Sequence, residues 1–169
     1  KTALEAARGA ALVVGSFSAA SNVTGILTDA DAVTRLLKAH GALAVWDYAC
    51  AAPYLPMDMG SGAVAKDAIV FSPHKFPGGP GATGVLVLRD TLCQRTAPTA
   101  PGGGSVSFVS PWRHAWSRRV EAREEAGTPN VIGDIRAALA LLVKDAVGPA
   151  RILAREAGLR RRALSPWAG

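Results

Sequence analysis

The sequence has few of the residues that build disulfide or metal frameworks. Only two cysteines, Cys50 and Cys93, occur among its 169 residues, and they form no CxxC pair. A disulfide scaffold is therefore excluded, and a reducing compartment, the cytoplasm or an organelle, is the expected location. The three histidines, His40, His74 and His114, lack the spacing of metal ligands, so we expect no bound metal.

Long apolar runs are also absent. No stretch approaches the roughly 18 apolar residues that a membrane span needs, so we expect no membrane partner. The run AALVVGSFSAAS follows Lys1 and Arg8 and superficially resembles a signal peptide. However, Gly15 and Ser16 interrupt this run, and a strand explains it equally well. The sequence does not begin with Met, and we expect it to belong to a longer protein.

Acidic residues are fewer than basic ones, and the formal net charge is +6. Much of the basic excess lies in the segments RHAWSRRVEAR and AREAGLRRRALSPWAG, a pattern that favours solvated helix faces. A nucleic-acid-binding module is the alternative. No aromatic-interleaved RNA motif or zinc-finger spacing supports that alternative, so we do not expect nucleic acid as a partner. Hydrophobic residues make up 49% of the chain, which predicts a globular protein.

Short, continuous apolar runs predict the strands of a layered α/β sheet. Strands buried on both faces are expected at residues 12–17, 42–46, 67–72 and 83–88. Between the first two, Thr28 is expected to cap a helix, with Asp31 completing a partial capping box. His40-Gly41 is expected to end that helix.

The second half of the chain predicts less regular structure. The segment TAPTAPGGGSVSF indicates a linker or crossing segment, and Trp112 and Trp116 are expected to pack in a helix or crossing segment. EEAGTPN then leads into a helix, which Gly148-Pro149 ends. Its apolar residues form one stripe, the pattern of a helix that packs on a core: Val131, Ile132, Ile135, Ala138, Leu139 and Leu142.

Chemically distinctive side chains follow three of the expected strands. Asn22 comes after the first strand, Asp47 ends the second, and the Ser72–Lys75 segment follows the third. Ligands of open α/β sheets bind at the carboxyl ends of the strands, so we expect these residues to share one edge. A lysine beside a carboxylate suits pyridoxal phosphate, which needs a Schiff-base lysine and an acid next to its pyridine nitrogen.

Four sequence blocks resemble successive blocks of the class V aminotransferase family, which includes the cysteine desulfurases. They are SNVTG, VWDYA, FSPHKFPGGPGATGVLVLR and EEAGTPNVIGDIRAAL, and they extend from about Leu12 to Val147. The resemblance implies a three-layer α/β/α large domain of fold type I with a mostly parallel, incomplete sheet. It also implies that the strand after Lys75 is antiparallel. Residues 1–147 would be part of that cofactor-binding domain, and residues 148–169 a basic helix leading to a small domain.

The resemblance implies a role for each matching residue. Lys75 matches the Schiff-base lysine and Asp47 the partner of the pyridine nitrogen, the two expected catalytic residues. Ser72 and His74 match the phosphate-binding pair, and Asn22 matches an asparagine beside the ring oxygen and the substrate.

Thr128 matches a residue that contacts the phosphate of the neighbouring subunit's cofactor, which implies a homodimer. Where many desulfurases have a glutamine three residues after the aspartate, this chain has Cys50. The resemblance therefore implies an amino-acid substrate but leaves desulfurase and aminotransferase activity open. A non-catalytic fragment or dimerisation remnant of such an enzyme is the alternative.

Overall fold

The computed structural model describes residues 1–167, which form two compact units. Unit 1 comprises Lys1–Leu88 and the chain from Ile132 onward, and unit 2 comprises Arg89–Val131. The boundary expected at residue 148 falls inside unit 1. The helices, strands and 3₁₀ turns (η) of unit 1 are α1 (Thr2–Ala6), β1 (Val14–Ser18), α2 (Ala30–Ala39), β2 (Leu43–Asp47), η1 (Gly62–Val64), β3 (Ala68–Phe71), η2 (Pro73–Lys75), β4 (Val85–Leu88), α4 (Val131–Val147), α5 (Pro149–Leu164) and η4 (Ser165–Trp167).

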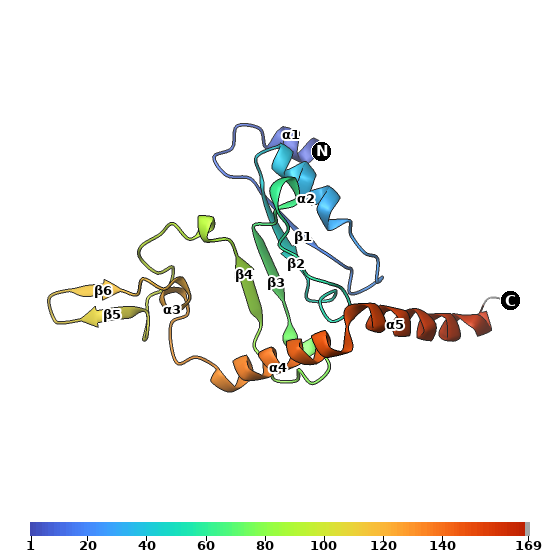
Figure 1. Cartoon of the computed structure of the whole chain (residues 1–169). Helices are drawn as coiled ribbons and strands as arrows, with labels where there is room; N and C mark the ends of the chain where they lie inside the picture. The colour runs from blue at the N-terminus through green and yellow to red at the C-terminus, as the bar shows by residue number, and fades with distance from the viewer. Residues whose placement is uncertain (168–169) are drawn as a thin grey trace. The chain divides into compact units, whose positions relative to one another are not determined.

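A four-stranded sheet in the order β1-β2-β3-β4 is the centre of unit 1 (Figure 1). β1, β2 and β3 are parallel to one another, and β4 is antiparallel to β3. The expected α/β class and the mostly parallel sheet are confirmed, as is the antiparallel strand after Lys75. Each strand begins one or two residues later than the sequence predicts.

Helix α2 begins one residue later than expected. Asp29, not Thr28, is the N-cap, and its carboxylate accepts a hydrogen bond from the Ala32 amide at 2.9 Å. The Thr28 hydroxyl instead donates to the Ser18 carbonyl at 2.8 Å, which ties the helix entrance to the end of β1. His40 ends the helix as predicted.

The face of the sheet beneath α2 is tightly packed. Ala44 and Trp46 of β2 are fully buried there, and the Trp46 indole donates to the Thr34 hydroxyl of α2 at 2.9 Å. A Cβ at Gly15 would overlap the Leu37 side chain, so the glycine allows α2 to lie close to β1.

The outer strands differ from the expectation that every strand is buried on both faces. Val14 and Phe17 of β1 are 48% and 46% exposed, and Leu86 of β4 is 58% exposed. Burial is concentrated in the two central strands, because the described chain places no further strand beside β1 or β4.

Two ion pairs connect α2 to the residues just before β3. Lys38 pairs with Asp67, and Lys66 pairs with Asp31 at 2.7 Å. The Asp67 carboxylate also accepts from the Ala44 amide at 2.7 Å. These charges therefore help to align the helix with two strands.

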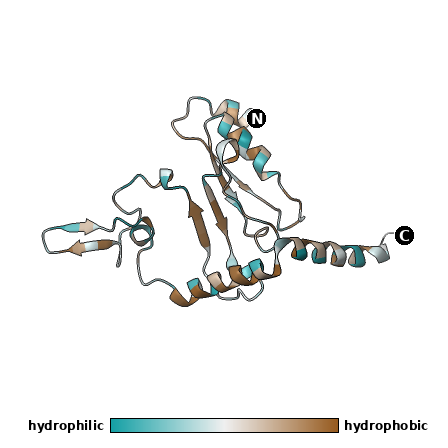
Figure 2. Cartoon of the chain, in the orientation of Figure 1, coloured by the Kyte–Doolittle hydropathy of each residue, from teal (hydrophilic) through white to brown (hydrophobic). Residues whose placement is uncertain are grey.

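The apolar stripe of α4 faces away from the core, contrary to expectation. Figure 2 shows brown, hydrophobic segments along this helix. Ile132, Ile135, Leu139 and Leu142 are all more than half exposed. The buried stripe instead comprises Gly133, Ala137, Ala140 and Lys144, which also recur at helical spacing. Small side chains let this side of the helix approach the protein closely, and the aliphatic side is left outside.

Helix α5 follows the break at Gly148, as predicted. Its side chains are largely exposed, and it carries most of the basic residues near the end of the chain. None of the helices in the described residues is both long enough and apolar enough to cross a membrane.

Residues 96–105 of unit 2 are irregular, as expected, but a small hairpin that the sequence did not predict follows them. β5 (Val106–Val109) and β6 (His114–Trp116) pair antiparallel with an irregularity, and η3 (Asp90–Leu92) and α3 (Val120–Glu124) flank them in sequence. Trp116 therefore lies in a strand, and Trp112 lies in the connecting turn, where it is 90% exposed. The Glu124 carboxylate accepts from the Thr99 amide at 2.9 Å, and this hydrogen bond lowers the pKa of Glu124.

Candidate active site

Asp47 lies at the carboxyl end of β2, on the edge that the sequence predicts. It pairs with Ser18 of β1 and Val70 of β3. Side chains alternate along a strand, so Asp47 points to the face opposite the buried Trp46. The Asp47 carboxylate is exposed and accepts a hydrogen bond from the Ala49 amide at 2.7 Å.

Lys75 is held on a short 3₁₀ turn directly after β3. Pro73 begins this turn, and the Lys75 amide donates to the Ser72 carbonyl at 3.0 Å. A Cβ at Gly79 would overlap the Pro73 carbonyl oxygen, so the following loop folds under the turn only with glycine there. The Lys75 side chain is exposed and forms no hydrogen bond or ion pair with residues 1–167.

A buried aromatic residue anchors the turn that carries Lys75. Phe76 is 3% exposed, and its ring stacks on Phe71 of β3 with a centroid separation of 6.2 Å. Because Phe76 is adjacent to Lys75, its packing restricts the movement of the lysine backbone. The exposed Lys75 amine thus lies on a turn that a buried aromatic residue anchors.

Ser72 and His74 flank Pro73 on the same turn. Ser72 is partly buried and is the N-cap residue, and the His74 side chain is exposed. The structure therefore brings a hydroxyl, an imidazole and an amine together within four consecutive residues. Asp47 lies on the neighbouring strand of the same edge.

Asn22 lies in the turn that follows β1, and its side chain is exposed. The neighbouring Ser21, rather than Asn22, holds this turn: its hydroxyl accepts from the amides of Val23 and Thr24 at 3.2 and 3.1 Å. The Ala19 amide donates to the Asp47 carbonyl at 2.8 Å, which brings the start of the turn to the end of β2. Asn22 is thus three residues from a contact with Asp47.

Thr128 is exposed and lies in unit 2, just before α4. The preceding Gly127 amide donates to the Gly103 carbonyl at 2.7 Å, which fixes this segment within its own unit. Thr128 is therefore not part of the set of residues that unit 1 brings together.

The segment after Asp47 contains chemistry that sequence reasoning missed. Tyr48 is 6% exposed, and burial together with the Asp31 and Asp58 carboxylates raises the pKa of its phenol. Lys144 of α4 donates to two carbonyl oxygens of the same segment. Lys144 follows small residues at helical spacing, and this is the only sequence signal that could have indicated the burial of Lys144.

A groove of about 670 Å³ borders the Asn22 turn. Residues on both sides of Asn22 line it, together with Cys50 and α5 residues that include Arg160. Cys50 is partly buried and has a free thiol. The groove offers space for a small molecule near the carboxyl edge.

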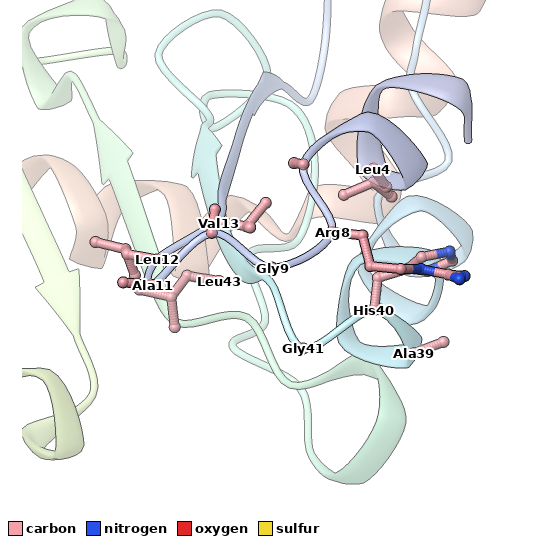
Figure 3. A pocket seen from close by; sticks show the side chains of 12 residues that line it. Leu4, Arg8, Gly9, Ala11, Leu12, Val13, Ala39, His40, Gly41 and Leu43 are labelled. Carbon is pink, nitrogen blue, oxygen red and sulfur yellow. The ribbon is translucent and has the colours of Figure 1, made fainter.

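A second pocket, of about 370 Å³, lies at the opposite end of the sheet. Figure 3 shows Arg8, His40 and Gly41 among its lining residues, between the chain entering β1 and the end of α2. It adjoins the amino ends of the parallel strands, where ligands of open α/β sheets do not bind. It is not the candidate active site.

The side chains at the carboxyl edge fit pyridoxal phosphate by their chemistry. An amine can bind the cofactor's carbonyl carbon, and a carboxylate can pair with its pyridine nitrogen. A hydroxyl and an imidazole can donate to a phosphate. Lys75, Asp47, Ser72 and His74 provide these four groups.

Comparisons with known proteins agree with this fold. The family model described as Aminotransferase class-V matches residues 2–166. A cysteine desulfurase of Klebsiella pneumoniae is 37% identical over 144 residues, which cover 85% of this chain and 35% of that protein. The apo structure of a cysteine desulfurase from Thermococcus onnurineus has a TM-score of 0.81 at 29% identity, covering 90% of this chain and 37% of that one. A cysteine desulfurase structure from Escherichia coli has a TM-score of 0.70 at 28% identity, covering 82% and 34%.

The fold and its relatives place the protein among the fold type I α/β proteins. The chain belongs to the class V aminotransferase family. It spans about a third of the length of the curated relatives that it matches.

Proposed function

We propose that this chain carries part of the active site of a pyridoxal-phosphate-dependent enzyme that acts on an amino acid. The family supports this function, because class V aminotransferases and cysteine desulfurases depend on this cofactor. When bound, the cofactor withdraws electrons from the substrate's Cα and so makes its bonds easier to break. The observation that carries the proposal is an exposed Lys75, without an ion pair in the described part of the chain, on a turn beside the strand that ends in Asp47.

Each residue of the edge has a proposed role. The Lys75 amine would hold the cofactor's carbonyl carbon and would move a proton at the substrate's Cα. The Asp47 carboxylate keeps the pyridine nitrogen protonated through its negative charge. Ser72 and His74 bind the phosphate, and Asn22 contacts the ring oxygen and the substrate.

The proposed assembly is a homodimer. Thr128 would contact the phosphate in the neighbouring subunit's site, as the family pattern implies. Its exposed position in a unit separate from Lys75 is compatible with this role. The relatives support removal of sulfur from cysteine as the reaction, since the matched proteins of Klebsiella pneumoniae and Thermococcus onnurineus are cysteine desulfurases. Cys50 and Cys93 are both partly buried in this chain, and neither is proposed as the sulfur carrier.

The direct test is covalent capture of the cofactor. The protein is mixed with pyridoxal phosphate, reduced with borohydride, digested and analysed by mass spectrometry. We expect the added mass on the peptide that contains Lys75 and its loss in Lys75→Ala. Lys1→Ala is the matched control, because Lys1 is also an exposed lysine. Equal labelling of Lys1 and Lys75 would show that the reaction is nonspecific and would overturn the assignment.

A further inference from the structure

Lys144 is a buried cation on the core-facing side of α4. It is 7% exposed and continues the stripe formed by Gly133, Ala137 and Ala140. No carboxylate in the described part of the chain forms an ion pair with it. Burying an ammonium is costly unless its hydrogen bonds are satisfied, so its surroundings must compensate.

Two backbone carbonyls provide that compensation. The Lys144 ammonium donates to the Ala52 oxygen at 2.5 Å and to the Leu55 oxygen at 2.6 Å. Both carbonyls lie at the carboxyl end of the turn segment 48–55, in which the Ala52 amide donates to Tyr48 and the Leu55 amide donates to Ala51. Carbonyls in this position lack following helical N–H groups and attract a positive charge. Lys144 therefore caps the carboxyl end of segment 48–55, which follows Asp47.

The same nitrogen also contacts the segment that carries Lys75. It lies 5.5 Å from the ring centroid of Phe76, within the range of a cation–π interaction. Phe76 is adjacent to Lys75 and is buried against Phe71. One ammonium thus contacts the chain five residues after Asp47 and one residue after Lys75.

We propose that Lys144 is a positioning residue that fixes the segment after Asp47 relative to the turn that carries Lys75. It touches neither the cofactor nor the substrate in this role. Its functional consequence rests on the proposed function, because it assumes that Asp47 and Lys75 serve one cofactor. The mechanical part of the proposal, a shared anchor for two segments, does not depend on that assumption.

The first experiment tests the mechanical part without any cofactor. Amide hydrogen exchange is compared between the protein and its Lys144→Met variant, which keeps the length and apolar stem of the side chain. We expect segment 48–55 and the turn at residues 73–79 to lose protection together. Arg136→Met is the matched control, because Arg136 on the same helix donates to the Pro80 carbonyl at 3.3 Å and forms no hydrogen bond with segment 48–55 in the described part of the chain.

The second experiment measures retention of pyridoxal phosphate and the pH titration of its visible absorbance. We expect Lys144→Met to bind the cofactor about 10 to 100 times more weakly, as for other residues that orient a binding group. The midpoint of the pH titration should shift, because the distance between the Asp47 carboxylate and the Lys75 amine changes. Lys144→Arg should recover part of the cofactor affinity and part of the titration midpoint, since a guanidinium can also donate to two carbonyls and stack on a ring.

The outcomes separate this inference from the proposed function. If only α4 loses protection in Lys144→Met, or if Arg136→Met loosens both segments equally, Lys144 is not a shared anchor. If both segments loosen but affinity and titration are unchanged, Lys144 does not position the site. If Lys144→Met does not fold, Lys144→Arg is tested alone. This folded variant is expected to keep part of the protection of both segments and part of the cofactor affinity, and loss of both overturns the proposal. Failure of the protein itself to bind the cofactor contradicts the proposed function, and the exchange result stands independently.

Discussion

The charged residues beneath α2 and those at the carboxyl edge of the sheet have opposite environments. Beneath α2, Lys38 pairs with Asp67 and Lys66 pairs with Asp31, and the lysine of the second pair is almost fully buried. At the carboxyl edge, Lys75 is exposed and forms no ion pair with the described residues. Paired charges contribute to the arrangement of helix and strands, whereas an unpaired amine at an edge remains available to a ligand.

The largest effect on stability is expected from Asp67→Ala. This change leaves the Lys38 ammonium and the Ala44 amide without their acceptor, and Ala44 is fully buried. We expect the free energy of unfolding to fall by about 2–3 kcal/mol, at the low end for a broken ion pair because Lys38 is partly exposed. Denaturant unfolding measures the change. Asp145→Ala, at an exposed position of α4, is the control. An equal loss of unfolding free energy in the two variants would refute the contrast between paired and exposed charges.

A smaller, pH-dependent effect is expected from Tyr48→Phe. The pKa of Tyr48 is raised from 10.0 in the folded protein, chiefly by burial. Above about pH 10 the unfolded chain loses this proton first, so the free energy of unfolding falls as pH rises. The slope from one tyrosine is at most about 1.4 kcal/mol per pH unit. Comparing unfolding of the protein and Tyr48→Phe across this range should show that the variant lacks this decline.

Tyr54→Phe provides the matched control for Tyr48→Phe. Tyr54 is 42% exposed and lies in the same segment. Tyr54→Phe therefore removes a phenol that is in contact with solvent. An identical change of slope in both variants would mean that the burial of Tyr48 has no energetic consequence.

The smallest effect on stability is expected from Lys75→Met. The Lys75 side chain is exposed and has no partner in residues 1–167, so its loss should change the free energy of unfolding by no more than about 0.5 kcal/mol. The measurement is the same denaturant unfolding. A loss of stability as large as that of Asp67→Ala would mean that Lys75 stabilises the fold, and would argue against its role as a ligand-binding residue.

The parallel sheet was predictable because its strands are short apolar runs separated by strong turn signals. The runs ending at Asp47 and Ser72 gave the correct strands within one or two residues. The cap of α2 was misplaced because Thr28 and Asp29 are both good capping residues. The sequence does not show that the Thr28 hydroxyl bonds to Ser18 instead.

The orientation of α4 was not predictable from apolar periodicity alone. Two stripes recur at helical spacing on this helix, one of large aliphatic residues and one of small residues ending in Lys144. Hydrophobicity favours the first, but close packing selects the second, and its lysine is acceptable only because Ala52 and Leu55 present free carbonyls. Such acceptors become visible only when segments about 90 residues apart are brought together.

The hairpin of unit 2 was missed because its strands are short and adjoin a segment rich in glycine and proline. The positions of the candidate site residues on β2 and η2 were predictable because these residues follow strong strand signals. Thr128 has no comparable signal, and its assignment depends on the family pattern alone.

The packing of Gly79 against the Pro73 carbonyl has a consequence for natural variation at this position. Any side chain there would first have to rebuild the turn beneath Lys75, even though Gly79 need not touch a ligand. Selection on this glycine would thus act through the shape of the backbone, and a relative without a lysine at the position of Lys75 could still retain it.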